Sequence, residues 1–410
     1  MKKLLSIFLA AIMLSSFTAC SQNQSSTTQS SNETTTIEST QPTTEEEEKL
    51  LAETDELKWS DYKVYNLKED VPVKNIVLMI GDGMGENIIK ASEIVKGDKL
   101  TMSGLPHKTH VITSSLSVEK GYEEFTDSAA SATAISTGVK TYNQYIGVDG
   151  EGNNLETICE YAKKLGLKTG LVDRHYVFHA TPAGMVAHNI SRHSSRAILR
   201  EMIESHVNVM FGGGSGHYTT STSVKRTVKE NDYTYISTEE ELLALKAGDD
   251  RILGMFSHSN MGPADMNPSL TTMTAKALEL LDNDDGFFLM VEGSNIDVYA
   301  AEEDMASTLE QMQSFDLTTD YVLDWAEDHP GTLVIVTADH ETGGVEIPEN
   351  ATAEDIDDSC FTSGGEHTNR NVLLMAGGAQ SAGICEKDLI DNTDIAKYMR
   401  KVLADSHKTE

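Results

Sequence analysis

The chain has few cysteines. Four occur among 410 residues. Cys20 falls in an N-terminal segment with the features of an export signal, which leaves Cys159, Cys360 and Cys385 for a folded domain. Such an odd and sparse set does not indicate a disulfide framework. A bridge between Cys360 and Cys385 stays open, but nothing in the sequence supports it.

The chain is also poor in basic residues. Lys and Arg total 32 against 65 Asp and Glu, which gives a net charge of −33, and no basic block occurs beyond the first three residues. Nucleic-acid binding requires Lys and Arg clustered on phosphates, so we expect no nucleic-acid partner. A small anionic ligand remains compatible, because a local positive site can lie inside an acidic protein.

Long hydrophobic runs are missing as well. The run "LLSIFLAAIML" follows Lys2 and Lys3 and is too short for a good membrane span. With "SSFTAC" after it, the pattern predicts an export signal over residues 1–20, with Cys20 as a lipidated N-terminus and membrane anchor. The alternative is an ordinary cleaved signal with a stray cysteine. Residues 21–55 are polar and low in complexity, which predicts a flexible tether.

Residues 56–410 are expected to fold as one large domain. From about residue 70, apolar runs alternate with helical patterns: "KNIVLMIGDGMG", "GLKTGLVD", "VNVMFGGG", "GFFLMVEGSNID" and "GTLVIVTADHETGG" are separated by "NLETICEYAKKLG", "SSRAILREMIES", "TMTAKALELL" and "TTDYVLDWAEDH". Strands that alternate with helices predict an α/β fold with a parallel sheet covered on both faces. Ligands in such folds bind beyond the carboxyl ends of the strands.

Residues of metal-binding type stand at those strand ends. They are Asp82 after the first run, Glu292 and Asp297 after "FFLMV", Asp339 and His340 after "TLVIVTA", and His367 in a later loop. Carboxylates together with imidazoles suit zinc, whereas carboxylates with a hydroxyl suit magnesium. Each acid taken alone is more typical of a turn or a helix cap, and only the combination indicates a metal site.

The segment "TDSAASATAISTG" (residues 126–138) predicts an unusual helix of small residues. Thr126 or Asp127 can cap it, which puts Ser128 in the first turn. Free amides and the positive end of the helix dipole favour a bound phosphate and an ionised hydroxyl there. Serine is a weak nucleophile unless it is activated, and metal coordination is one means. Small residues let the helix approach neighbouring backbone closely.

From about residue 75 to its end, the sequence resembles the alkaline phosphatases. The motif "DSAASATAISTGVKTYN" is highly specific, and "NIVLMIGDGMG", "HATPAGMVAHNISR", "MVEGSNID", "VTADH" and "GGEHT" occur in the family's order. The resemblance implies a three-layer α/β/α sandwich with a mainly parallel sheet. It also implies an exported enzyme that hydrolyses small phosphate monoesters through a phosphoserine, uses Zn²⁺ and Mg²⁺, and forms a homodimer.

The resemblance further implies roles for individual residues. Ser128 corresponds to the nucleophile, and Arg192 to the guanidinium that grips two phosphate oxygens. The metal ligands it implies are Asp82, Asp339 and His340 for the zinc beside Ser128; Asp297 and His367 for the other zinc; and Asp82, Thr181 and Glu292 for magnesium. His179 stands where the family carries Asp or His beside the magnesium. We expect all these residues to converge in one cleft.

One position departs from the family. A histidine normally follows Asp297 by four residues and completes that zinc site, but Ala301 stands here. Glu302 or Glu303 is a candidate replacement ligand. His175 is a second unusual histidine near the magnesium loop, and an ordinary loop role suits it better than a ligand role.

Two further interpretations remain open. The chain can be a lipoprotein that binds phosphate or a phosphorylated ligand with little turnover, or a phosphodiesterase on the same scaffold. The presence of Ser128, Arg192 and the magnesium set favours the phosphomonoesterase, because a binding protein has little need of a nucleophile.

Overall fold

The computed structural model describes residues 57–407. The export signal, the lipidated Cys20 and the tether predicted for residues 1–55 lie outside the described residues and stay predictions. All described residues belong to one compact unit. Among them, no helix is long and apolar enough to cross a membrane. Cys159, Cys360 and Cys385 are all unpaired, so the bridge between Cys360 and Cys385 does not form.

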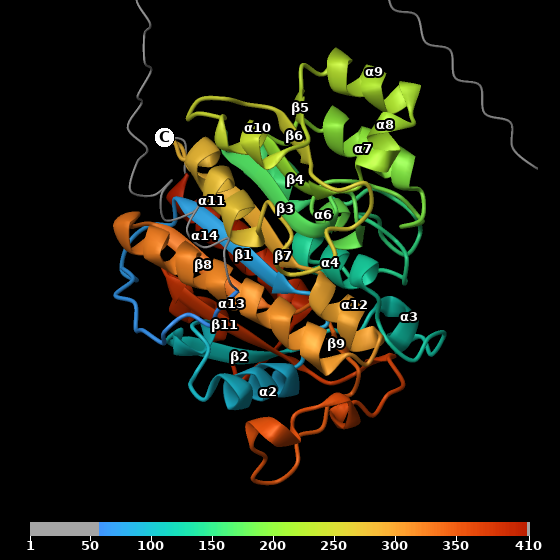
Figure 1. Ribbon diagram of the computed structural model, residues 1–410. Helices are drawn as coiled ribbons and strands as arrows, with labels where there is room; N and C mark the ends of the chain where they lie inside the picture. The colour runs from blue at the N-terminus through green and yellow to red at the C-terminus, as the bar shows by residue number, and fades with distance from the viewer. Residues whose placement is uncertain (1–56, 408–410) are drawn as a thin grey trace, which may run out of the picture. The chain divides into compact units, whose positions relative to one another are not determined.

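A ten-stranded sheet organises the domain (Figure 1). Its order is β12-β2-β11-β8-β1-β7-β3-β4-β6-β5, and β11 alone runs antiparallel to its neighbours. The strands are β1 (Asn75–Gly81), β2 (His107–Ile112), β3 (Lys168–Tyr176), β4 (Val209–Gly213), β5 (Thr234–Ile236), β6 (Ile252–Met255), β7 (Phe287–Gly293), β8 (Thr332–Thr337), β11 (Val372–Gly378) and β12 (Leu389–Asp391). A separate two-stranded sheet pairs β9 (Glu341–Thr342) with β10 (His367–Thr368).

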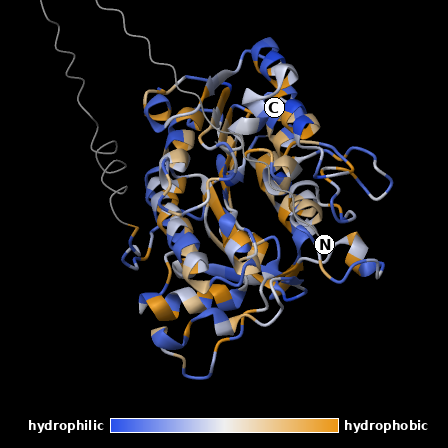
Figure 2. Ribbon diagram, turned by 45° about the vertical axis from the view of Figure 1, so that its right-hand side comes forward, coloured by the Kyte–Doolittle hydropathy of each residue, from blue (hydrophilic) through white to orange (hydrophobic). Residues whose placement is uncertain are grey.

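Helices cover both faces of the sheet (Figures 1 and 2). They are α2 (Glu86–Lys96), α3 (Leu116–Glu119), α4 (Ser128–Thr137), α5 (Ile158–Lys164), α6 (Ala180–Gly184), α7 (Ser195–Glu204), α8 (Ser215–Thr219), α9 (Thr222–Glu230), α10 (Glu239–Leu243), α11 (Leu270–Leu281), α12 (Asn295–Ala301), α13 (Met305–Asp328) and α14 (Asn392–Ser406). The long helices α11 and α13 pack together on one face, while α14 contacts α4 and α5. The predicted α/β sandwich with a mainly parallel sheet is confirmed.

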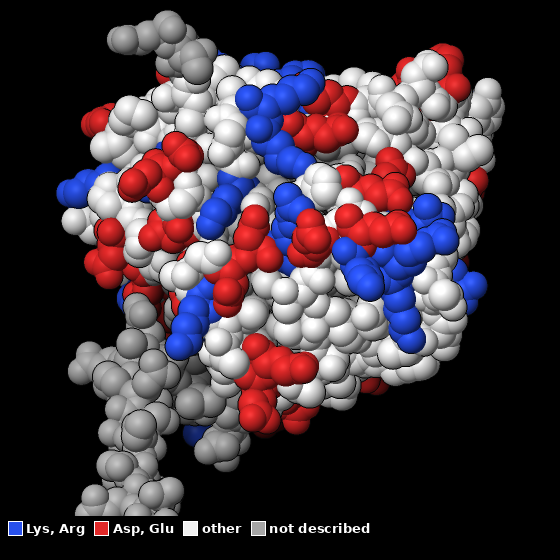
Figure 3. All heavy atoms as spheres, turned by 90° about the horizontal axis from the view of Figure 1, so that it is seen from above, with Lys and Arg blue, Asp and Glu red and all other residues white. Residues whose placement is uncertain are grey.

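Continuous apolar runs explain the central strands. Every residue of β1, β7 and β8 is buried, as expected for strands that are covered on both faces. Surface helices such as α7 and α9 combine hydrophobic and hydrophilic residues along their length (Figure 2), which lets them present an apolar side to the protein interior and a polar side to water. On the face drawn in Figure 3, Lys and Arg lie among Asp and Glu and form no basic patch.

Helix α4 is packed on all sides, which accounts for its small residues. Residues 128–136 are all buried, and α4 contacts both α6 and α14. A Cβ added to Gly184 of α6 would lie 2.8 Å from the Cβ of Ala132, so the two helices approach as closely as their backbones allow. Larger side chains would force α4 away from this position. Asp127 caps the helix, accepting a hydrogen bond from the Ala130 amide at 3.0 Å.

Candidate active site

The site lies where β8, β1 and β7 end. These three strands are neighbours and run parallel, so the residues at their carboxyl ends meet at one edge of the sheet. Asp82 follows β1, and Glu292 is near the end of β7. Asp339 and His340 come shortly after β8. Asp297 projects from α12, and His367 belongs to β10, which crosses beside the same edge.

Gly83 allows the turn after β1 to pass close to this centre. Its backbone has a φ of +71°, a conformation that favours glycine. A Cβ at this position would lie 2.7 Å from Thr342 Oγ1 and 3.0 Å from Asp297 Oδ1. The Gly83 amide also donates a hydrogen bond to Asp339 Oδ1 at 3.1 Å. The "GDGMG" motif therefore brings main chain, and not only Asp82, into the site.

Three groups of side chains are spaced to hold metal ions, with their ligand atoms within 4.8 Å of one another. They are Asp297, His340 and His367 (the outer cluster); Asp82, Asp339 and His340 (the central cluster); and Asp82, His179 and Glu292 (the inner cluster). Thr181, at the start of α6, lies beside Glu292. The clusters share Asp82 and His340, so they form one continuous centre.

Several buried oxygens in this centre have no hydrogen-bond partner within residues 57–407. They are Thr181 Oγ1 and both carboxylate oxygens of Glu292; Asp82 Oδ1 and Asp339 Oδ2 also accept no hydrogen bond from the described residues and face only the His340 imidazole, at 3.3 and 3.2 Å. A buried polar atom without a partner is costly, and a buried carboxylate without a counter-ion is more so. Divalent cations bound by these oxygens and imidazoles remove that cost. The donor set thus fits the metals that the sequence suggested.

Burial and charge perturb the acids of this centre in two ways. Burial, with the neighbouring carboxylates, raises the pKa of Asp82 and of Glu292 well above their usual range. Burial alone would raise the pKa of Asp297 also, but His367, His340 and Thr342 outweigh it and hold that pKa below its usual range. For Asp82 the attraction of Arg192 is too weak to offset burial and the neighbouring carboxylates, whereas Asp297 has the His367 imidazole beside it.

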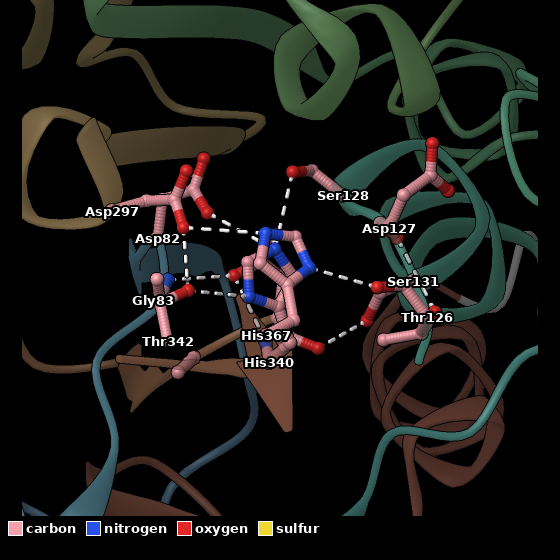
Figure 4. Close-up of polar contacts among 12 residues, drawn as sticks. Asp82, Gly83, Thr126, Asp127, Ser128, Ser131, Asp297, His340, Thr342 and His367 are labelled. Atoms are coloured by element: carbon pink, nitrogen blue, oxygen red, sulfur yellow. Dashed lines mark hydrogen bonds and ion pairs between the residues drawn. The ribbon is translucent and has the colours of Figure 1, made fainter. Parts of the chain in front are cut away.

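Ser128 is the first residue of α4, so its hydroxyl lies at the helix N-terminus. Its Oγ is 3.3 Å from Nε2 of His340, and that nitrogen lies 3.3 Å from Asp82 Oδ1 and 3.2 Å from Asp339 Oδ2 (Figure 4). The His340 and His367 rings stack with centroids 3.6 Å apart. A hydroxyl in this position faces the central cluster directly.

Arg192 reaches the site from the loop between α6 and α7. Its Nη1 donates a hydrogen bond to Asp127 Oδ2, and its Nη2 donates to His179 Nε2, both at 3.1 Å. These contacts hold the guanidinium between the cap of α4 and the inner cluster. Ser128, Arg192, Thr181 and the six predicted acid and histidine ligands are therefore linked through one chain of neighbouring groups.

A comparison with known proteins agrees with this geometry. Residues 73–356 match the sequence model of the family described as alkaline phosphatase. The chain belongs to the alkaline phosphatase family. It is 34% identical over 311 residues to alkaline phosphatase 4 of Bacillus subtilis, covering 72% of this chain and 67% of that protein. It is 31% identical over 415 residues to the alkaline phosphatase of Escherichia coli, covering 82% and 87%.

Solved structures agree in fold. The alkaline phosphatase from the Antarctic bacterium TAB5 superposes with a TM-score of 0.73 at 28% identity, covering 83% of this chain and 100% of that one. A cold-active alkaline phosphatase from Shewanella gives the same TM-score at 27% identity, with 80% and 99% covered. Membership of the family makes the chain a phosphatase and supports the hydrolysis of phosphate monoesters.

The outer cluster lacks the histidine that is expected four residues after Asp297. Ala301 is exposed at the end of α12, one turn beyond Asp297. Among residues 57–407, neither Glu302 nor Glu303 belongs to any of the three groups, and His175 does not either. The His175 ring instead packs on His179, with centroids 4.2 Å apart.

Two contributors were not identified from the sequence. Thr342 Oγ1 donates a 2.5 Å hydrogen bond to Asp297 Oδ1, and the Thr126 carbonyl lies 2.9 Å from His367 Nδ1. Both fix the orientation of outer-cluster residues. The position of Thr342 two residues after His340 was the available signal. His179 belongs to the inner cluster, where the sequence had placed it only beside the magnesium ligands.

A hollow of about 560 Å³ opens next to the outer cluster of this phosphatase. Its lining includes His367 and Thr126 together with the acids Glu123, Glu124 and Glu366. The hollow adjoins the cap of α4 through Thr126. Its acidic walls would repel a ligand group that carries negative charge.

Proposed function

We propose that this phosphatase is a metal-dependent phosphomonoester hydrolase that acts through a phosphoserine on Ser128 and releases inorganic phosphate. One observation carries the proposal: Ser128 Oγ lies at the N-terminus of α4 and 3.3 Å from His340, inside a centre of unpartnered carboxylate oxygens. A phosphate binder without turnover has no use for a hydroxyl held there.

We assign Zn²⁺ to the outer and central clusters, because both combine imidazole with carboxylate. We assign Mg²⁺ to the inner cluster, where Asp82, Glu292 and Thr181 supply oxygens and where His179 Nε2 already accepts a hydrogen bond from Arg192. A solved variant of the TAB5 enzyme holds magnesium, which supports the presence of that metal in the family. When bound, these cations would neutralise phosphate oxygens and lower the pKa of attacking and departing oxygens.

The protein's own groups would act in a fixed order. Ser128 Oγ gives up its proton to water and attacks phosphorus, an Oγ–P bond forms, and the P–O bond to the alcohol breaks, so that the departing oxygen takes a proton from water and leaves as the alcohol. Water then attacks the phosphoserine, and Ser128 Oγ departs as phosphate is released. Two of the five guanidinium N–H groups of Arg192 bond to Asp127 and His179, and we infer that others bind phosphate oxygens. The amides at the start of α4 support the same charge.

The test measures release of a phenolate from an aryl phosphate after chelation and after zinc and magnesium are restored. We expect metal-dependent turnover, and a phosphorylated Ser128 peptide when the reaction is stopped in acid. Ser128→Ala is the control. Tight phosphate binding without turnover would favour the binding lipoprotein. Faster cleavage of a bis-aryl phosphate would favour the phosphodiesterase.

We also propose that the protein is exported and anchored by a lipid on Cys20, with residues 21–55 as a tether to the catalytic domain, and that it forms a homodimer. The absence of a basic block supports small phosphorylated substrates over nucleic acid. Incorporation of labelled fatty acid into the full chain but not into Cys20→Ser tests the anchor. Light scattering on residues 56–410 tests the dimer.

A further inference from the structure

Asp173 is a buried carboxylate that the proposed reaction does not use. It lies on β3 directly opposite Glu292 of β7, and neither residue is exposed to solvent. Its Oδ1 accepts hydrogen bonds from Ser294 Oγ at 2.6 Å and from the His175 amide at 2.8 Å. Its Oδ2 is buried and accepts no hydrogen bond from an N–H or O–H donor of the described residues, while the Asp173 carboxyl contacts that of Glu292.

The guanidinium of the neighbouring Arg174 does not bond to Asp173 Oδ2. Arg174 follows Asp173 on the strand, but successive side chains of a strand point to opposite faces. The Arg174 guanidinium donates instead to four main-chain carbonyls of the loop before α11, those of Met261, Pro263, Met266 and Pro268. Two carboxylates thus face each other in the interior, which is strongly unfavourable unless a cation lies beside them.

Asp173 contacts Glu292 but is not a member of the inner cluster, so its oxygens are not placed to bind the same ion directly together with Asp82 and Glu292. Magnesium keeps several of its water molecules when proteins bind it, and each water needs an acceptor for its protons. An unpartnered carboxylate oxygen behind a ligand is such an acceptor. Zinc, which favours four-coordinate sites, would make less use of it.

We propose that Asp173 is a positioning residue of the inner metal site, where its Oδ2 accepts a hydrogen bond from a water molecule of a hydrated magnesium ion held by Asp82 and Glu292. The inference rests on the proposed metal-dependent function. It assigns to Asp173 a role in affinity for magnesium and in preference for magnesium over zinc. Ser294 contributes by fixing the rotation of the Asp173 carboxylate.

The experiment uses the full chain, stripped of metal and reloaded with zinc, and titrates it with magnesium by calorimetry. Asp173→Asn should weaken magnesium binding about tenfold, the loss typical when a partner of a metal ligand is removed. The metal-free variant should melt at the same temperature as the metal-free parent or higher, because one of two facing buried charges is gone. Ser294→Ala keeps the charge and should show a smaller loss of magnesium affinity.

Asp316→Asn is the matched control. Asp316 is also fully buried, but its two oxygens accept hydrogen bonds from the amides of Thr101 and Met102 at 3.1 and 3.2 Å. This variant should melt lower with and without magnesium and should bind magnesium as the parent does. A purely structural Asp173 would behave in the same way.

The outcomes separate the two proposals. Unchanged magnesium affinity in Asp173→Asn, or a metal-free variant that melts lower or fails to fold, overturns the role of Asp173 and leaves the phosphatase proposal intact. If removing and restoring zinc and magnesium changes neither the activity nor the melting temperature of the parent protein, the metal-dependent function itself is overturned.

Discussion

His188 should make the fold lose stability as the pH becomes alkaline. Its Nδ1 lies 3.0 Å from Glu201 Oε1, and its Nε2 lies 2.8 Å from the Leu155 carbonyl oxygen. Both partners only accept hydrogen bonds, so both ring nitrogens must donate, and only the imidazolium does that. Burial alone would lower the pKa of His188, but hydrogen bonds with Glu160 and Glu201 outweigh it and raise the pKa to about 10.

The sign and size of the effect follow from proton linkage. The folded pKa of His188 lies above the unfolded value of 6.5, so its stabilisation is complete below pH 6.5 and is lost as the pH rises towards 10. At about 1.36 kcal/mol per pH unit, this window sets an upper limit of about 5 kcal/mol. Glu160 and Glu201 are about one-third exposed (38% and 31%), and screening by water reduces the expected loss to about 3 kcal/mol.

Denaturant unfolding of the parent and of His188→Gln at pH 6.5, 8, 9 and 10 measures the contribution of His188 to the free energy of unfolding. The parent should lose about 3 kcal/mol more than the variant between the first and last pH. His110→Gln, which removes a half-exposed histidine beside the single carboxylate of Glu86, is the control. If the free energy of unfolding of the parent and of His188→Gln falls in parallel with pH, His188 is not held as an imidazolium in the folded protein.

Other substitutions test the site itself. Ser128→Ala should lower kcat by on the order of 10⁴-fold or more without changing metal content, as measured by turnover and mass spectrometry; substantial residual activity would contradict the covalent route. Ala301→His should tighten zinc binding by about tenfold or more and raise turnover, whereas no gain would mean that another group completes the outer cluster. Glu366→Gln should raise kcat/KM by about twofold for monoesters of anionic alcohols relative to neutral ones, and an equal effect on both would exclude electrostatic selection.

The sequence predicted the middle of the sheet but not its edges. The five apolar runs that it identified became β1, β3, β4, β7 and β8, because a strand buried on both faces needs an uninterrupted apolar sequence. The edge strand β12 and its neighbour β2 carry exposed and polar residues and give no such signal. The antiparallel direction of β11 depends on its partners β8 and β2, and pairing direction is not encoded in the composition of one strand.

The candidate site was predicted to a similar extent and for a similar reason. A residue at the end of a buried parallel strand must lie near the ends of the neighbouring strands. Residue type and position together therefore predicted Asp82, Glu292, Asp339 and His340. The side chains of a strand interior give no equivalent signal. Asp173 looks like any acid in "GLVDRHY" until the register opposite Glu292 is known.

The alanine at position 301 reduces the number of metal ligands in the outer cluster. Residues four apart lie on the same side of a helix, so a side chain at position 301 of α12 can join Asp297. An alanine there leaves Asp297 and His367 without a third ligand of their own, and they share His340 with the central cluster. The acid-rich inner end contains more carboxylate than its neighbours can satisfy. Affinity for zinc should therefore be lower at the outer cluster than at the central one.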